Sequence, residues 1–208
     1  LTIPKGDGPF RGVVLVHGSG PNDRDETVGA EKPFKDLAWG LSSMGVAVLR
    51  YDKRTKVYAA KLANSTDNFT VIEETIDDAV IASELLRHEN KIDSIKVFVL
   101  GHSLGGMVIP RIAKADSMIA GFIIMAGPTR PLEDLIFAQM NYLASLDSII
   151  SDDEMNQLKT IQEQVAKVKS SDLALNTSPS DLPLGVPASY WIDLRKHDSA
   201  KEAKDINR

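Results

Sequence analysis

The chain has 208 residues, 43% hydrophobic and 25% charged side chains, and a formal net charge of −5, which fits one folded domain or one domain with an insertion. Charges of both signs are mixed along the sequence without a basic block, so no nucleic-acid partner is expected. No apolar run is long enough to span a membrane. The absence of cysteine excludes disulfides, thiolate catalysis and thiolate metal sites.

Both ends of the sequence read as cuts in a longer polypeptide. Residues 1–4 have the pattern of a strand tail, and residues 204–208 lie in the middle of a polar helical pattern. A leader could precede Leu1, so the compartment is unknown. A cytoplasmic location is favoured, and secretion is not excluded.

The first 125 residues alternate short apolar runs with helical patterns. The runs are rich in β-branched residues and lack regular alternation, which is typical of strands buried on both faces of a parallel sheet. The expected order is strand 12–17, helix 33–44, strand 46–51, helix 71–89, strand 95–100, helix 103–114 and strand 119–125. This order predicts an α/β fold with a mostly parallel sheet and right-handed crossovers.

After Gly127 and Pro128 the pattern is helical only. Helical spacing over 132–146 is followed by a capping-box sequence at 151–154, a second helix, a loop over 179–187 and a short helix at 190–194. We expect a core over residues 1–130, a helical cap inserted over 131–195, and a truncated return toward the core over 196–208. A helical layer beside the sheet is the alternative.

The candidate nucleophile is Ser103, in the turn Gly-His-Ser-Leu-Gly at 101–105. A Gly-x-Ser-x-Gly sequence after a strand and before a helix is the pattern of a nucleophile elbow, in which a sharp turn lifts the serine hydroxyl above the sheet. Small residues are needed because strand and helix pack closely there, and Gly101, Gly105 and Gly106 supply them. The alternative is an inactive or structural turn.

The sequence His-Gly-Ser-Gly at 17–20 lies at the end of the first long strand. Hydrolases with a nucleophile elbow place half of their oxyanion hole at this point. Two backbone N–H groups that point at the carbonyl oxygen stabilise its developing charge. We expect these donors to be the N–H groups of Ser19 and of Leu104, the residue after the nucleophile. An ordinary glycine-rich turn is the alternative.

The sequence resembles a family of bacterial serine carboxylesterases of the α/β-hydrolase superfamily, near the dienelactone-hydrolase and prolyl-oligopeptidase-like groups. The resemblance runs from Leu1 to about Asp198, and its matching segments are 16–26, 36–41, 49–55, 99–107 and 188–191. It implies a three-layer fold and hydrolysis of carboxylic esters without metal or cofactor. It also implies that Ser103 is the nucleophile and that Ser19 and Leu104 are the oxyanion donors.

The sequence departs from this family because two further strands, which carry the triad acid and the triad histidine, are not found. The expected order is Ser, Asp, His, so the missing groups are expected beyond Arg208. Among the histidines present, His17 is expected to orient the oxyanion loop, His102 to point away from the hydroxyl of Ser103, and His88 to be solvated. Asp193 and His197 could pair on one helix, but no strand separates them.

The sequence also offers weaker candidates for substrate binding. Gly20, His102, Tyr190 and Trp191 are candidate substrate-binding residues. The two aromatic residues could line an acyl pocket beneath the cap, although aromatics at such spacing are more often core. The charged runs 23–26 and 50–54 lie at strand ends, where Arg24 or Arg54 could meet a substrate carboxylate, but pairing of these charges with one another, which orders the loops, is favoured. No histidines stand at ligand spacing near the acids, so a metal site is not expected.

Three functions fit these observations. The leading hypothesis is cleavage of a small-molecule ester through an acyl-enzyme on Ser103, with the cap setting substrate size. A peptidase or amidase of the same fold is the second. The third is a catalytically incomplete fragment or binding module without the triad acid and histidine. An unpaired sheet edge would also allow a homodimer.

Overall fold

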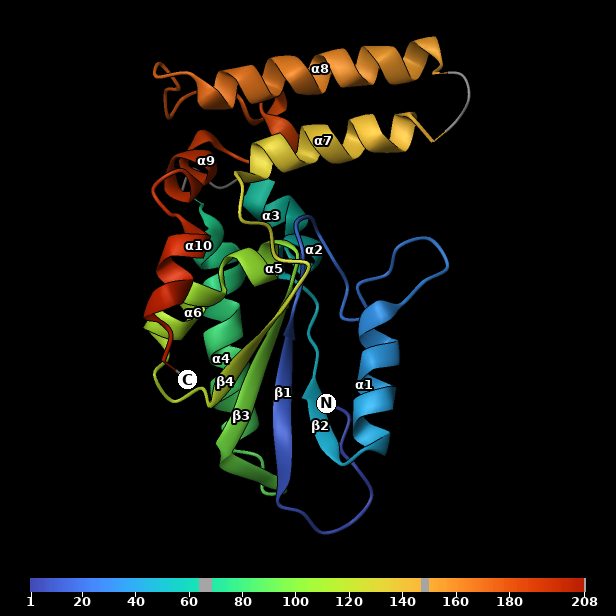
Figure 1. Cartoon of the computed structure of the whole chain (residues 1–208), viewed down its shortest axis with the longest axis vertical. Coiled ribbons are helices and arrows are strands. Elements are labelled where there is room, and N and C mark those ends of the chain that lie inside the picture. The colour runs from blue at the N-terminus through green and yellow to red at the C-terminus, as the bar shows by residue number, and fades with distance from the viewer. Residues whose placement is uncertain (64–68, 147–149, 208) are drawn as a thin grey trace. The chain divides into compact units, whose positions relative to one another are not determined.

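The computed structural model describes residues 1–63, 69–146 and 150–207, and in them four parallel strands form one sheet. The strands are β1 (Phe10–Val16), β2 (Val46–Leu49), β3 (Ile92–His102) and β4 (Gly121–Met125). They lie in the order β2-β1-β3-β4 (Figure 1). Parallel pairing joins Val13 to Val48 and to Phe98, and Leu100 to Ile123. The expected parallel sheet is confirmed.

The N-terminal residues lie beside β2. Thr2 and Val48 form an isolated antiparallel bridge, in which each N–H donates to the other residue's carbonyl oxygen at 2.8 Å. Residues 1–4 therefore lie beside the sheet, as their strand-like sequence predicts.

Helices cover both faces of the sheet (Figure 1). On one face α1 (Pro33–Ser43) packs on β2, and its buried Phe34 and Ala38 join Val13, Leu15, Val48 and Leu100 in a single apolar cluster. On the other face α4 (Asp77–Arg87) packs on β1 and β3. The strands are therefore buried on both sides, which explains their continuous apolar sequences.

Two predicted helices are interrupted. The helix expected over 71–89 opens with a π-helical turn at Ile72–Ile76 before α4 begins. The helix expected over 103–114 is divided into α5 (Leu104–Met107) and α6 (Ile109–Ala115), with a break at Val108. Pro110 accounts for this break, because proline has no N–H to donate to the preceding turn.

Two short helices, α2 (Arg54–Val57) and α3 (Ala59–Ala63), follow β2 and were not expected from the sequence. Near the C-terminal end lie α10 (Ser199–Glu202), which packs on α6, and a 3-10 turn at Ala203–Asp205. The polar helical pattern expected at 204–208 is thus only partly helical in the described residues.

The chain divides into two compact units. One contains residues 1–67, 71–129 and 198–208, and the other contains 68–70 and 130–197. The second unit holds α7 (Leu132–Ala144), α8 (Asp152–Lys169), 3-10 turns at Pro179–Asp181 and Pro183–Gly185, and α9 (Ala188–Leu194). Helices α7 and α8 pack on each other, and Lys169 Nζ lies 2.6 Å from Asp134 Oδ1.

The capping box expected at 151–154 is confirmed. The N–H of Glu154 donates to Ser151 Oγ, and the N–H of Ser151 donates to Glu154 Oε2 at 2.8 Å, so the first turn of α8 has two of its free donors satisfied. No helix in the described residues combines the length and the apolar character needed to cross a membrane.

Candidate active site

Ser103 lies in a sharp turn between β3 and α5, at the carboxyl end of the sheet. Its backbone has φ 51° and ψ −116°, a conformation that is strained for a residue with a side chain. Its own N–H donates to the carbonyl oxygen of Met125 at 3.0 Å, which extends the pairing of β3 with β4 into the turn. The strained turn leaves Ser103 half-buried at the end of the strand.

Close backbone contacts around this turn explain its glycines. A Cβ atom built on Gly101 would lie 2.7 Å from the nitrogen of Gly106, and one on Gly106 would lie 2.9 Å from the Cα of Gly127. Real side chains do not tolerate such distances. The three elements that meet here, β3, α5 and the end of β4, can approach only because these positions have no side chain.

The loop after β1 passes directly beside Ser103, the candidate nucleophile. A Cβ atom built on Gly18 would lie 3.2 Å from the Cβ of Ser103, so the Gly18 backbone and the Ser103 side chain are immediate neighbours. Within the described parts of the chain, the N–H groups of Ser19 and Leu104 make no hydrogen bond. Both expected oxyanion donors are thus available next to Ser103, and their role stays a prediction.

Glu26 connects this loop to the nucleophile turn. Its carboxylate is 3% exposed, accepts a hydrogen bond from the Gly18 N–H at 2.7 Å, and lies 2.9 Å from Nδ1 of His102. The hydrogen bond with Glu26 raises the pKa of His102 above its ordinary value. His102 is therefore held by Glu26, next to Ser103.

Lys53 supports the same loop from the side of β2. It is 1% exposed, its ammonium donates to the carbonyl oxygen of Gly18 at 3.0 Å, and it pairs at 2.9 Å with Glu74, which is 3% exposed. Asn22 adds hydrogen bonds from Nδ2 to the carbonyl oxygens of Gly18 at 3.2 Å and of Ser19 at 3.1 Å. The 17–20 loop is thereby fixed by side chains from two segments, Asn22 and Glu26 from one and Lys53 from the other.

His17, the first residue of the 17–20 loop, is buried. It is 1% exposed, and its ring packs 5.0 Å from the ring of Phe34 and 5.2 Å from that of Tyr51. Burial lowers the pKa of His17 to about 4, so the ring is neutral near pH 7. This position is consistent with a histidine that supports the loop.

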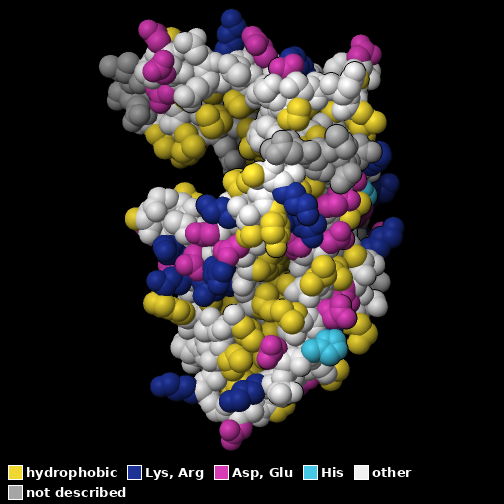
Figure 2. Space-filling model, turned by 180° about the vertical axis from the view of Figure 1, so that it is seen from behind, with side chains coloured by type: hydrophobic (Ala, Val, Ile, Leu, Met, Phe, Trp, Pro, Cys, Tyr) yellow, Lys and Arg dark blue, Asp and Glu magenta, His cyan; other side chains and the backbone are white. Residues whose placement is uncertain are grey.

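The charged runs at the strand ends pair with one another, as favoured from the sequence. Arg24 bonds to Asp52 through its backbone N–H at 2.8 Å and through its guanidinium, and Arg50 pairs with Asp25. Figure 2 shows that basic and acidic side chains lie close together on the face that it draws.

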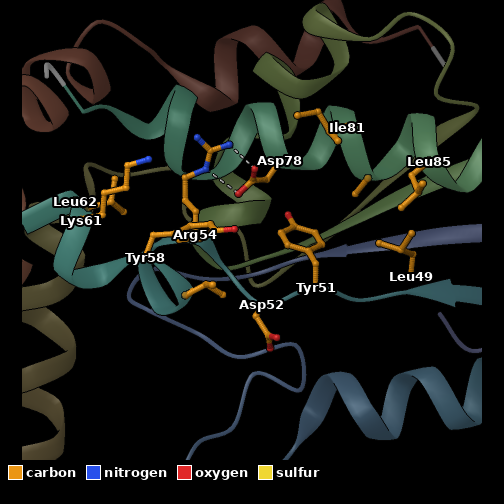
Figure 3. Close-up of a pocket in the computed structure, with 12 residues that line it drawn as sticks. Leu49, Tyr51, Asp52, Arg54, Tyr58, Lys61, Leu62, Asp78, Ile81 and Leu85 are labelled. Carbon is orange, nitrogen blue, oxygen red and sulfur yellow. Dashed lines mark hydrogen bonds and ion pairs between the residues drawn. The ribbon is translucent and has the colours of Figure 1, made fainter. Parts of the chain in front are cut away.

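A pocket of about 580 Å³ opens where the end of β2 meets α2, α3 and α4 (Figure 3). Its walls are mainly apolar, and Arg54 and Asp78 form a two-bond ion pair inside it, with Arg54 Nε 3.0 Å from Asp78 Oδ2. Arg54 therefore has a partner within the protein. The lining residues do not include Ser103 or the 17–20 loop; they are Leu49, Tyr51, Asp52, Arg54, Val57, Tyr58, Lys61, Leu62, Asp78, Ile81, Ala82 and Leu85.

The remaining candidates belong mostly to the second unit. Tyr190 and Trp191 are 1% and 0% exposed and meet in a T-shaped contact with ring centroids 6.0 Å apart, which favours a core role over an open pocket wall. Asp193 lies in α9 and His197 just beyond it, with no described strand between them. In the first unit, Gly20 has φ 91° and open space around it.

The last histidine, His88, is exposed at the end of α4, as expected. Within the described ranges, no group of three or more His, Cys, Asp or Glu side chains is placed to hold a metal ion.

Sequence reasoning missed Glu26, Lys53 and Glu74 as parts of the site. Glu26 and Lys53 stand in the charged runs 23–26 and 50–54. Their neighbours Arg24, Asp52 and Arg54 are charged as well but lie nearer the surface. Only the fold decides which charge in such a run is buried. Glu74 stands three residues after Val71 on a helix whose exposed acids look identical in sequence.

Comparison with known proteins shows the family of the chain. A profile described as the alpha/beta hydrolase family matches residues 13–197. Esterase EstD of Thermotoga maritima is 45% identical over 206 residues, which are 99% of this chain and 46% of that protein. The chain therefore spans about half the length of this relative.

Solved structures show the same fold at low identity. An esterase of Pyrococcus furiosus, PF2001, has a TM-score of 0.54 and 17% identity, with 97% of this chain and 71% of that chain covered. The alpha/beta hydrolase GrgF from Penicillium sp. sh18 has a TM-score of 0.50 and 14% identity, with 93% and 68% covered.

Proposed function

The chain belongs to the alpha/beta hydrolase family, and from this membership we propose that it carries the nucleophile and the oxyanion donors of a serine hydrolase that cleaves carboxylic esters. One observation carries the proposal. The Ser103 side chain stands half-buried in a strained turn directly beside Gly18, and the N–H groups of Ser19 and Leu104 on either side make no hydrogen bond within the described chain.

The proposed reaction proceeds in two halves. Ser103 Oγ attacks the ester carbonyl carbon while its proton passes to a histidine, which we place beyond residue 208. The N–H groups of Ser19 and Leu104 stabilise the tetrahedral oxyanion. Its collapse breaks the bond to the alcohol oxygen, which leaves with the proton from the histidine. Water, deprotonated by the same histidine, then cleaves the acyl-enzyme and restores Ser103.

The direct test is covalent labelling of the whole polypeptide that contains residues 1–208. A fluorophosphonate probe is expected to add to Ser103, detected by mass spectrometry of the peptide that contains it, and Ser103→Ala is the control. An unlabelled Ser103 in folded protein would contradict the nucleophile role and favour a binding module.

An ester is proposed over an amide because a relative that is 45% identical over 99% of this chain is named an esterase. Rates on nitrophenyl acyl esters and on aminoacyl nitroanilides, measured side by side, separate the two. Faster turnover of the anilides would favour the peptidase or amidase hypothesis. The mechanism uses no metal or cofactor.

We further propose that the unit formed by residues 130–197 acts as a cap that sets substrate size. Its helix α7 presents Tyr142 and Leu143, which are 63% and 58% exposed. The variant Tyr142→Ala/Leu143→Ala is expected to raise KM for long acyl chains more than for acetate esters. Lys159→Ala on the exposed side of α8 is the matched control. An unchanged chain-length profile would contradict the cap role.

The homodimer also stays a proposal. Among the described strands β4 pairs only with β3, and Ile123 and Ile124 are each 49% exposed on it. Light scattering coupled to size exclusion measures the oligomeric state of the whole polypeptide, and a monomeric mass would contradict the dimer.

A further inference from the structure

The peptide group between Gly18 and Ser19 is held at its carbonyl end. The Gly18 oxygen accepts hydrogen bonds from Lys53 Nζ at 3.0 Å and from Asn22 Nδ2 at 3.2 Å. In a planar trans peptide the carbonyl oxygen and the N–H point in opposite directions. Fixing the Gly18 oxygen toward Lys53 therefore fixes the Ser19 N–H away from Lys53.

The preceding peptide is held as well. The Gly18 N–H donates to Glu26 at 2.7 Å, and the same carboxylate contacts His102, the residue before the nucleophile. Gly18 is thus anchored through both its N–H and its carbonyl oxygen. Rotation of the Gly18–Ser19 peptide would break the bond to Lys53, so the direction of the Ser19 N–H is restricted.

Lys53 brings a full positive charge to this peptide. Its ammonium and its partner Glu74 are almost completely buried, at 1% and 3% exposure. A buried ion pair is weak support for fold stability, because an apolar pair of similar volume is often as stable. A cation at a peptide oxygen, however, polarises the peptide and strengthens its N–H as a donor, most of all where water is excluded.

We propose that Lys53 is a positioning residue of the oxyanion hole, which orients and polarises the Gly18–Ser19 peptide so that the Ser19 N–H binds the tetrahedral oxyanion. This inference rests on the proposed function, since it needs Ser103 to form such an oxyanion. Lys53 acts through the peptide and does not touch the substrate. Glu74 holds the ammonium in place, and Asn22 shares the Gly18 oxygen with it.

The test replaces both charges of the buried pair. Lys53→Met alone would remove the ammonium that lies 2.9 Å from the buried Glu74 carboxylate, so the main variant replaces both residues as Lys53→Met/Glu74→Gln. Arg87 and Asp116 form another, largely buried ion pair in the same unit, with Arg87 Nη1 2.8 Å from Asp116 Oδ2 and side chains 14% and 7% exposed. The variant Arg87→Met/Asp116→Asn is the control for loss of an ion pair away from Ser103.

Two measurements on the whole polypeptide, kcat and the affinity for a boronic acid, report on the oxyanion hole. For Lys53→Met/Glu74→Gln, kcat on a nitrophenyl ester is expected to fall by about 10- to 100-fold, while KM changes by less than about threefold. The affinity for an alkyl boronic acid, whose tetrahedral adduct on Ser103 places a charged oxygen in the same site, is expected to fall in parallel. Circular dichroism and urea unfolding verify that the variant is folded.

Should the double variant fail to fold, Asn22→Ala gives a second test, because it removes the other donor to the Gly18 oxygen. Its kcat and boronic acid affinity are expected to fall together by about three- to tenfold. The inference is overturned if kcat and boronic acid affinity stay at the level of the Arg87/Asp116 control, or if only KM changes. If the unsubstituted protein neither hydrolyses esters nor labels at Ser103, the proposed function itself fails.

Discussion

Gly105 lies directly against the backbone of His17: a Cβ atom built on Gly105 would lie 2.7 Å from the His17 carbonyl oxygen and closer still to that of Val16. This contact brings the start of α5, which follows Ser103, against the end of β1, which leads into the 17–20 loop. The two halves of the proposed oxyanion hole are thus joined through one residue without a side chain.

Gly105→Ala is expected to destabilise the fold by at least ~2 kcal/mol, because backbone on both sides must move to admit one methyl group. Labelling of Ser103 by a fluorophosphonate should slow as well. Urea unfolding and labelling kinetics measure the two effects. Gly40→Ala, in α1 with open space around the position, is the matched control and should stabilise by roughly 0.5–1 kcal/mol. Equal stability of the two variants would show that the turn is not closely packed.

The positive φ of Ser103 gives a prediction that separates function from stability. Ser103→Gly should unfold at higher urea concentration than Ser103→Ala, by roughly 1 kcal/mol, because only glycine adopts this conformation without strain. Both variants should lose hydrolysis and labelling. If Ser103→Ala is as stable as Ser103→Gly, the turn is relaxed in solution.

The burial of His17 predicts an acid-dependent loss of stability. Its folded-state pKa, lowered to about 4, lies below the ordinary value of 6.5, so the unfolded chain binds the proton more readily. The neutral His17 ring therefore makes its full contribution to the free energy of unfolding above pH 6.5. This contribution is lost as the pH falls toward 4, by about 3 kcal/mol in all. Urea unfolding from pH 7 to pH 4 should show this loss in the parent protein. In His17→Phe it should be absent, and equal pH slopes would refute the assignment.

Glu26 should keep His102 protonated to higher pH than an ordinary histidine, because the ring nitrogen faces a buried carboxylate. NMR titration of the His102 ring is expected to give a pKa above the ordinary value in the parent protein and a lower one in Glu26→Gln. Glu31→Gln, an exposed acid of the same loop, is the control and should leave the His102 titration unchanged. A titration insensitive to Glu26→Gln would show that the pair does not form.

His197→Ala in the whole polypeptide is expected to retain esterase activity, because the general base is proposed to lie beyond residue 208. His197 is exposed and follows α9 directly, rather than a strand. Hydrolysis of a nitrophenyl ester measures the outcome. Complete loss of activity in folded His197→Ala would reassign the general base to His197.

Local sequence determined the strands, the nucleophile turn and the capping box at Ser151. Strands buried on both faces need continuous apolar residues, and the turn at Ser103 needs small neighbours, so each leaves a pattern that is readable over a few residues. The break of the helix after Ser103 was also readable in principle, since Pro110 lacks the N–H that a continuous helix requires.

Only the tertiary structure decided which side chains hold the 17–20 loop. Glu26, Lys53 and Glu74 come from three segments far apart in sequence, and each looks like its exposed charged neighbours. Whether such a charge is buried depends on which strands and helices meet at the end of β1, and that follows from long-range packing. The sequence by itself therefore identifies Ser103 and the loop beside it, and the fold alone brings Lys53 to the Gly18 oxygen.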